Sequence, residues 1–126
     1  MTIIGHGVDL VEVDRIRAAL ERHGDRFANR IFTQGEQSQA GNGPLRVQFF
    51  AGRFAAKEAV MKALGVGWGR YAGWLDIEVV RAPGRRPELV LAGSAARRAA
   101  TMGITRLHLA LTHTAETALA HVIAEA

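Results

Sequence analysis

The chain has 126 residues, a net charge of +4 and a pI near 10.6, and 48% of its residues are hydrophobic. We therefore expect one domain spanning residues 1–126, with enough apolar side chains for a core and a preference for an anionic partner. The absence of cysteine excludes disulfides and thiolate metal sites and fits a cytoplasmic protein. No apolar run reaches the roughly 18 residues of a membrane span, and residues 1–7 do not read as a signal peptide.

Residues 3–11 alternate in hydrophobicity and predict a strand that contains Gly5 and Gly7. Two glycines in a strand indicate the close approach of another backbone or of a ligand. Asp9 is unusual at this place, because aspartate is disfavoured in strands. Two interpretations of Asp9 stay open: it caps the helix that follows, or its carboxylate serves a functional site.

A helix is predicted from about residue 12 to residue 23, with Gly24 as its C-terminal stop. Arg15 and Arg22 share one face of this helix, and Arg26 could extend that face past the helix end. A solvated basic face is an ordinary explanation for such residues. The alternative is a docking surface for an acidic protein.

Residues 33–44 are polar and rich in turn formers, so they predict a loop or a short frayed helix. A long helix then runs from about residue 45 to residue 64, between Pro44 and Gly65. Its apolar stripe comprises Val47, Phe50, Phe54 and Met61, with Leu64 at the edge. Glu58 projects from the same stripe, and Lys62 follows one turn later. Their spacing fits a simple ion pair, or a metal-binding carboxylate beside an anion-binding lysine.

Residues 65–69, Gly-Val-Gly-Trp-Gly, form a glycine-rich turn. It either ends the helix or brings backbone N–H groups close to a ligand, and it is not a Rossmann or P-loop fingerprint. Alternation then predicts a strand over residues 74–81, a turn over residues 82–87 and an antiparallel strand over residues 88–91. Arg85 and Arg86 in that turn are interpreted as solvated charges.

Ser94 is predicted to cap a short helix that ends near Gly103. A hairpin follows, in which residues 107–113 and 117–124 alternate in hydrophobicity around a turn at residues 114–116. His113 ends an apolar strand face. It is either a satisfied structural histidine or, with its threonine neighbours, part of a set of hydrogen-bonding groups at the hairpin mouth.

These elements contain five short motifs, named here in chain order. They are Gly5-His6-Gly7-Val8-Asp9-Leu10 with Arg15-Ile16; Arg53-Phe54-Ala55-Ala56-Lys57-Glu58-Ala59; Lys62-Ala63 with Gly65; Asp76-Ile77-Glu78-Val79; and Thr112-His113-Thr114. In sequence, order and spacing the chain resembles the holo-acyl-carrier-protein synthases, the small type of 4'-phosphopantetheinyl transferase. One departure is Val66, where the family often has threonine. The resemblance implies an α+β fold, with a mostly antiparallel sheet packed against a long central helix and shorter helices.

The resemblance also implies a reaction, in which the 4'-phosphopantetheine arm of coenzyme A moves to a serine of apo acyl carrier protein in fatty acid biosynthesis. It implies that Asp9 and Glu58 bind Mg²⁺, and that Glu58 or a metal-bound water accepts the serine proton. Glu58, Lys62 and His113 would be the catalytic residues. The implied coenzyme A pocket comprises Arg53, Lys62, Gly65, Gly67, Thr112 and His113. The acidic carrier protein would dock on Arg15, Arg22 and Arg26, and the family forms homotrimers with active sites between subunits.

Two other classes of function explain part of the sequence. A basic nucleic-acid-binding module would explain the pI, but Asp9 and Glu58 would repel phosphates without a metal. The chain also has few aromatic residues, at 6%, and no run of basic residues longer than two, so no nucleic-acid partner is expected. A non-catalytic subunit that binds carrier protein would not need Asp9, Glu58 and Lys62.

Overall fold

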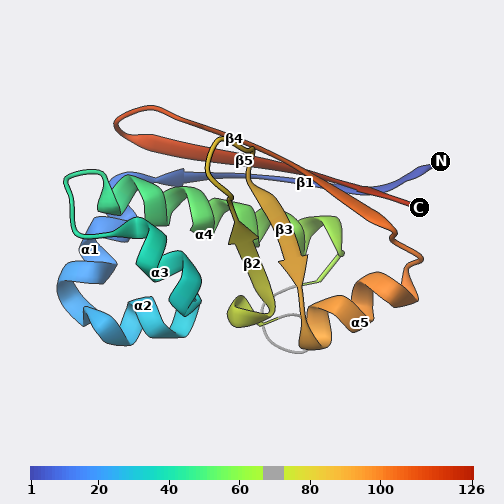
Figure 1. The fold of residues 1–126 in the computed structure, drawn as a ribbon, viewed down its shortest axis with the longest axis horizontal. Helices are drawn as coiled ribbons and strands as arrows, with labels where there is room; N and C mark the ends of the chain where they lie inside the picture. Colours follow the sequence, from blue (N-terminus) through green and yellow to red (C-terminus); the bar gives the residue numbers. More distant parts are fainter. Residues whose placement is uncertain (67–72) are drawn as a thin grey trace.

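The computed structural model describes residues 1–66 and 73–126. Its largest feature is an antiparallel sheet in the order β1-β5-β4, formed by β1 (Ile3–Glu12), β5 (Thr117–Glu125) and β4 (Arg106–His113). The long helix α4 (Arg46–Ala63) runs beneath this sheet (Figure 1). The sheet and α4 form two layers with the hydrophobic core between them.

Small side chains allow α4 to lie very close to the sheet. The face of β5 that meets α4 consists of Ala118, Ala120, Val122 and Ala124, all of them buried. On β1, a Cβ atom added to Gly7 would lie 2.0 Å from the carbonyl oxygen of Ala59, and one added to Gly5 would lie 2.5 Å from that of Ala63. The close approach predicted from these two glycines is confirmed, and the partner is the backbone of α4.

The predicted central helix is confirmed to within one residue at each end. Phe50, Phe54 and Met61 of its predicted apolar stripe are buried, and Val47 packs against the core. Lys57, seven residues after Phe50, is also fully buried, which the sequence did not predict. Gly65 has the positive φ of 67° that suits a helix stop.

Three short helices cover one end of the layers: α1 (Val13–His23), α2 (Asp25–Ile31) and α3 (Gln34–Ala40) (Figure 1). The N-cap of α1 is Glu12, and Asp9 lies within β1, opposite Ala120, so the capping interpretation of Asp9 is wrong. Helix α2 was not predicted, and Arg26 belongs to it rather than to an extension of α1.

The segment expected to be a loop or a frayed helix contains α3, and this helix has a complete capping box. The Thr33 hydroxyl accepts a hydrogen bond from the Glu36 amide, and the Thr33 amide donates to the Glu36 carboxylate. The sequence pattern Thr-x-x-Glu therefore marked a real helix start.

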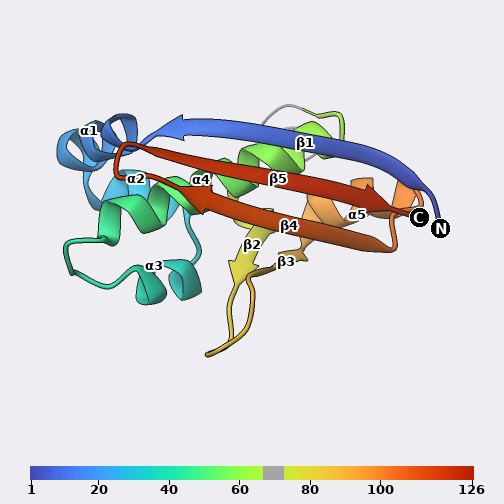
Figure 2. The same cartoon turned by 90° about the horizontal axis from the view of Figure 1, so that it is seen from above.

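A second, two-stranded sheet projects away from the first, formed by β2 (Ile77–Val80) and β3 (Glu88–Leu91) (Figure 2). Strand β3 has its predicted bounds, but β2 is shorter than predicted, because residues 74–76 form the 3₁₀ turn η1. The Asp76 carboxylate accepts hydrogen bonds from the Gly73 amide at 3.3 Å and from the Ser94 hydroxyl at 2.6 Å. This clamp orders the turn, and alternation alone could not reveal it.

Helix α5 (Gly93–Thr101) lies at the end opposite α1 (Figure 1). Its N-cap is Ala92, so the prediction that Ser94 caps it is wrong, because the Ser94 hydroxyl serves Asp76 instead. The hairpin of β4 and β5 is confirmed. Two antiparallel sheets, a long central helix and shorter helices make up the α+β fold expected from the resemblance. Within the described residues, no helix is long and apolar enough to cross a bilayer.

Candidate active site

Two carboxylates from different elements lie near each other beside the C-terminal half of α4. Asp9 is on the face of β1 that meets the helix, between Gly7 and Val11, and its side chain is only 16% exposed. Glu58 is half-buried on α4. Partial burial, and secondly the negative charge of Asp9, raise the pKa of Glu58 above its ordinary value. The fold thus holds two like charges close together in a partly desolvated place.

Lys62 is the main cation bonded to this pair. Its ammonium donates to the Asp9 carboxylate at 3.1 Å and to the carbonyl oxygen of Val8 at 2.9 Å. Lys62 therefore forms its ion pair with Asp9 on β1, and its charge acts on Glu58 by lowering the pKa of that carboxyl. The simple Glu58–Lys62 pair does not describe the site, which is a cluster of two carboxylates and a half-exposed lysine with Arg15 beside it.

The donor set of this cluster fits a hard divalent cation. Mg²⁺ takes oxygen ligands and is commonly held by one or two carboxylates, with water and phosphate completing its shell. No group of three or more potential metal ligands occurs among residues 1–66 and 73–126. Burial, and secondly the charge of Asp9, raise the pKa of Glu58, and a bound dication would stabilise both carboxylates in their charged form. Asp9 and Glu58 are the residues that would hold it.

Arg15 of α1 lies beside the same cluster. Its guanidinium stacks over the ring of Phe54 at 5.4 Å, and its charge lowers the pKa of Glu58. Arg22 and Arg26 are exposed on α1 and α2. The three arginines predicted as a docking surface thus divide into one next to the carboxylates and two farther along the surface.

A separate cavity of about 520 Å³ collects the residues predicted at the other end of the substrate. It is lined by Arg53, Thr112 and His113, and also by Leu45, Gln48, Phe49, Gly52, Arg81, Pro87 and Leu111. Arg53 is only 6% exposed, and its guanidinium lies 4.0 Å from the centroid of the Phe49 ring. Burial lowers the pKa of Arg53. Cationic groups and apolar walls together suit a ligand with a phosphate and a flat ring.

The carboxylate cluster and this cavity lie on opposite flanks of α4. Asp9 on β1 and Leu111 on β4 both pair with Ala120, on the two sides of β5. The core face of β5 packs on α4 between them, so the interior between the two flanks is filled. Residues lining the cavity do not include Asp9, Glu58 or Lys62. A single chain therefore assembles the carboxylate cluster and assembles the cavity, but it does not bring these two halves of the predicted site together.

Of the predicted glycine contacts, Gly65 lies at the end of α4, and Gly67 is outside the described residues. A third feature, which the sequence did not predict, is the fully buried ion pair of Lys57 and Glu36 at 2.8 Å. Two signals could have found it. Lys57 falls on the apolar stripe seven residues after Phe50, and Glu36 is the acid of the Thr-x-x-Glu capping box.

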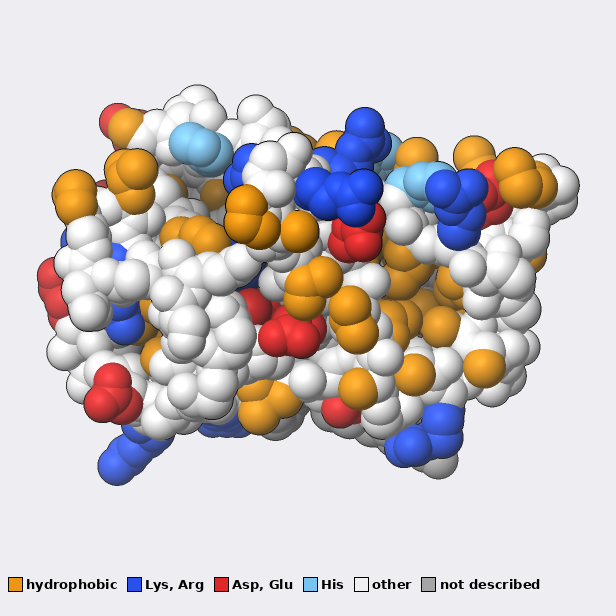
Figure 3. Space-filling model, viewed as in Figure 1, with side chains coloured by type: hydrophobic (Ala, Val, Ile, Leu, Met, Phe, Trp, Pro, Cys, Tyr) orange, Lys and Arg blue, Asp and Glu red, His pale blue; other side chains and the backbone are white. Residues whose placement is uncertain are grey.

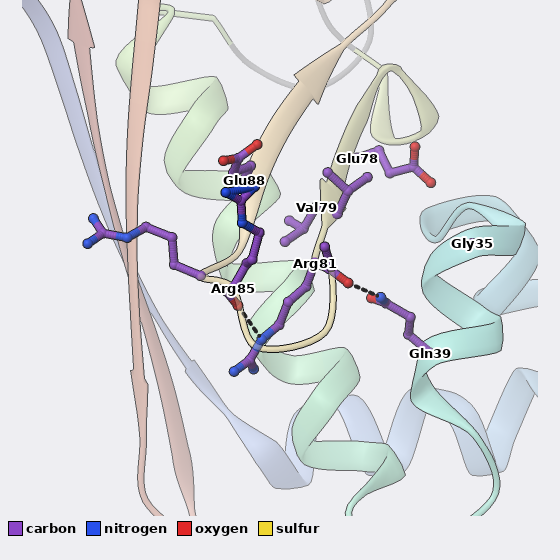
Figure 4. A pocket seen from close by; sticks show the side chains of 10 residues that line it. Gly35, Gln39, Glu78, Val79, Arg81, Arg85 and Glu88 are labelled. Atoms are coloured by element: carbon purple, nitrogen blue, oxygen red, sulfur yellow. Dashed lines mark hydrogen bonds between the residues drawn. The ribbon is translucent and has the colours of Figure 1, made fainter.

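A smaller cavity of about 330 Å³ lies between α3 and the β2–β3 hairpin (Figure 4). The Gln39 amide donates to the carbonyl oxygen of Arg81 at 2.9 Å, and the Arg81 Nε donates to that of Arg85 at 2.9 Å. Some polar groups of this cavity thus form their hydrogen bonds with one another. None of the predicted site residues lines it.

Arginines and a histidine gather near this hairpin and over β4, with an acidic side chain beside them (Figure 3). The charged residues that line the shallow hollow there are Arg86, Glu88, Arg106 and His108. This surface is basic but mixed in sign, and it is separate from Arg15, Arg22 and Arg26.

Comparison with known proteins now identifies the class. Residues 5–120 match the model of the 4'-phosphopantetheinyl transferase superfamily. The chain belongs to this superfamily.

Individual relatives identify the type of transferase within this superfamily. The chain is 47% identical over 123 residues to a holo-[acyl-carrier-protein] synthase of Solibacter usitatus, covering 98% of each chain. Its fold matches the crystal structure of that enzyme from Neisseria meningitidis with a TM-score of 0.90 and 32% identity, over 99% of this chain and 100% of the other. The structure from Bacillus anthracis, in complex with CoA (3',5'-ADP), matches with a TM-score of 0.81 and 36% identity, over 98% and 97%. Within the superfamily, the chain is thus an enzyme of the holo-acyl-carrier-protein synthase type.

Proposed function

We propose that this enzyme transfers the 4'-phosphopantetheine arm of coenzyme A to a serine of apo acyl carrier protein, with Mg²⁺ held by Asp9 and Glu58. The observation that carries the metal assignment is the adjacency of these two carboxylates at a partly buried place, where burial and then the charge of Asp9 raise the pKa of Glu58. Lys62 bonds directly to Asp9, and Arg15 acts on Glu58 from beside the cluster. Two carboxylates at a partly exposed place suit a site that gains a cation with its substrate.

The chain's own residues have distinct roles in this proposal. Bound Mg²⁺ would neutralise charge that develops on the pyrophosphate of coenzyme A as the bond breaks. Lys62 is 54% exposed, so its ammonium can exchange Asp9 for a phosphate oxygen. Glu58, or a water bound to the metal, would accept the proton of the attacking serine. Adenosine 3',5'-bisphosphate then leaves as the second product.

The cavity on the other flank of α4 is proposed to hold the nucleotide end of coenzyme A. Arg53 and His113 supply groups for a phosphate, and Thr112 adds a hydroxyl. The Bacillus anthracis relative was solved with CoA (3',5'-ADP), so a protein of this fold binds that end of the substrate. Gly65, and Gly67 on sequence grounds, would approach the ligand next to Lys62.

Because the two halves lie on opposite flanks of α4, we propose that each active site combines the carboxylate cluster of one subunit with the cavity of a neighbour in a homotrimer. The outer face of the sheet supports such contacts. Val8 and Leu10 are 49% and 62% exposed there, and Leu119 pairs with Leu10 in the register. Exposed apolar side chains of this kind, here with His6 and His121 on the same face, are typical of an interface between subunits.

The carrier protein is proposed to be acidic and to dock on Arg15, Arg22 and Arg26. The position of Arg15, next to Glu58, supports this assignment, because a carrier bound there would bring its serine toward the carboxylates. We propose the cytoplasm as the location and the activation of a fatty-acid carrier protein as the role.

Mass spectrometry of apo acyl carrier protein incubated with coenzyme A, Mg²⁺ and this enzyme tests the reaction. We expect the carrier to gain the mass of one phosphopantetheine arm. The gain should disappear in excess chelator, return with added Mg²⁺, and disappear in Asp9→Asn. A protein that binds the carrier but never adds the arm would be the non-catalytic subunit, and this result would overturn the proposal.

Mixing two inactive variants tests the shared site. Arg53→Gln damages only the cavity and Glu58→Gln only the carboxylate cluster, so each alone should be nearly inactive. If sites form between subunits, mixed trimers contain some intact sites, and activity should return after subunit exchange. Sedimentation of the wild-type chain should give three times the chain mass. Lack of any recovery, with subunit exchange demonstrated by differently tagged chains, would show that each subunit works alone.

A further inference from the structure

Gly52 lies inside α4, and nothing in the described part of the fold explains why it is a glycine. Its φ is not positive, and a Cβ atom added there would meet no atom of residues 1–66 and 73–126 within 4 Å beyond the backbone of its own helix. By contrast, Gly7 is required, since its Cβ would lie 2.0 Å from the carbonyl oxygen of Ala59. Glycine inside a helix destabilises the helix relative to alanine. The chain therefore carries a destabilising residue at a place where a side chain would fit.

The open space at Gly52 is the cavity of about 520 Å³. Helical spacing places Gly52 on one face with Leu45, Gln48 and Phe49, which also line it. Two polar atoms at the same cavity are buried without a hydrogen-bond partner, Gln48 Oε1 and Arg53 Nε. Buried polar atoms are normally paired, so these two are an independent sign that the cavity is built for a ligand.

We propose that Gly52 is a specificity-determining residue for coenzyme A. Its bare backbone lets the flat ring of the nucleotide end lie directly against α4, with the polar groups of Gln48 and Arg53 at the edge of the ligand. The inference rests on the proposed function, which assigns this cavity to the nucleotide. Apolar walls from Phe49 and Pro87 suit the faces of a ring, whereas an extended pantetheine arm has no such planar surface.

Gly52→Ala and Gly52→Leu give opposite effects on stability and on binding if this proposal is right. Both residues favour helices over glycine, so the melting temperature should rise by about 2–5 °C. A methyl group at the contact should raise the KM for coenzyme A about 3-fold, and the leucine side chain should raise it more than about 10-fold, with kcat changed less than about 2-fold. A residue with a purely structural role would not separate the two measurements in this way.

Gly43→Ala is the matched control, because Gly43 also has open space around its Cβ and a φ that is not positive, but does not line the cavity. It should leave the KM for coenzyme A unchanged. Calorimetry with adenosine 3',5'-bisphosphate and with 4'-phosphopantetheine then locates the effect. The Gly52 variants should weaken the bisphosphate by the same factor as coenzyme A and leave phosphopantetheine unaffected.

Three results would overturn the proposal. They are unchanged bisphosphate affinity in Gly52→Leu, weakened binding of phosphopantetheine alone, and a changed sedimentation mass at unchanged nucleotide affinity. The last would assign Gly52 to a contact between copies. Because bisphosphate binding is measured without the transfer reaction, a wild-type chain that transfers nothing would refute the proposed function while the calorimetry still decides the role of Gly52.

Discussion

Helix α4 carries two lysines, and each meets carboxylates in a different setting. Lys57 and Glu36 are both fully buried and 2.8 Å apart. The Lys57 ammonium also donates to the carbonyl oxygens of Trp74 and Ile77, at 2.9 and 2.6 Å. Glu36 in turn accepts hydrogen bonds from the Thr33 and Val79 amides, both at 2.9 Å. Every charge in this pair is matched inside the chain.

Asp9, Glu58, Lys62 and the neighbouring Arg15 form the second group, and it is open to solvent. Lys62 bonds to Asp9 but is 54% exposed, and Arg15 is exposed as well. A shifted pKa does not separate the two groups, since burial also lowers the pKa of Lys57. The difference is that Lys57 and Glu36 satisfy each other out of reach of any ligand, whereas the cations beside Asp9 and Glu58 are exposed and can be exchanged for a ligand. Charged groups that a ligand can reach are the better sign of function.

Breaking the buried pair should have the largest effect on stability. Lys57→Met leaves the Glu36 carboxylate buried without its cation, which should lower the free energy of unfolding by about 3–5 kcal/mol in a urea titration. The double variant Lys57→Met/Glu36→Leu removes both charges and should recover most of that loss. If the single variant lost less than about 1 kcal/mol, the pair would not be the structural element that we infer.

Glu58→Gln should have the opposite effect to Lys57→Met, with a large loss of activity and no loss of stability. Removing a metal ligand and proton acceptor should slow transfer at least about 100-fold. Because the folded-state pKa of Glu58 is raised, ionisation of Glu58 costs stability as pH rises through the interval from its unfolded to its folded pKa. The variant avoids this cost, so it should be as stable as wild type at low pH and slightly more stable at neutral pH. Urea titrations at both pH values measure this, and a variant less stable than wild type at neutral pH would contradict the raised pKa of Glu58.

The sequence predicted one of these two groups and missed the other, for a physical reason. Asp9 is conspicuous because aspartate in a strand is disfavoured, and the two glycines before it indicated a close neighbour. Lys57 adjoins Glu58 in a helix where charged residues are ordinary. Its burial depends on α3, which folds over it, and that tertiary contact leaves only a faint local signal in the capping box at Thr33.

The fold itself was largely predictable, because periodicity is local. The long helix, β3 and the last hairpin follow from alternation and from stop signals at glycine and proline. Helix α2 and the turn at residues 74–76 did not follow, because the latter depends on the contact of Asp76 with Ser94, 18 residues away. Motif order carries no information about which side of a helix a ligand occupies, so the division of the predicted site between two flanks of α4 did not follow from the residues. Only the family resemblance implied sites shared between subunits.

Asp76 is a fourth carboxylate, and like Glu36 it has a structural role. Hydrogen bonds, first from the Ser94 hydroxyl, hold its pKa below the usual range. A lowered pKa means that its contribution to stability is present above the unfolded pKa of about 3.9 and is lost as pH falls through the folded pKa. Asp76→Asn should cost about 1 kcal/mol at pH 7 in urea titrations, and the difference from wild type should shrink below about pH 4. A cost that does not depend on pH would mean that the charge of Asp76 is irrelevant.

The smallest expected effect concerns the charges that face the carrier protein. Arg22 is exposed on α1, so Arg22→Gln should leave stability unchanged. It should cost about 0.2–1 kcal/mol of binding free energy, which raises the KM for apo carrier protein about 1.5- to 5-fold. The effect should fade as salt is raised from about 50 to 500 mM, because the Debye length shortens. Arg85→Gln, in the exposed β2–β3 turn, is the matched control and should not alter that KM.

Arg15→Gln should also lower kcat, because Arg15 acts on Glu58. Equal effects of Arg22 and Arg85 would show that the carrier responds to net charge alone, and the distinction between the carboxylate side and the rest of the basic surface would then fail.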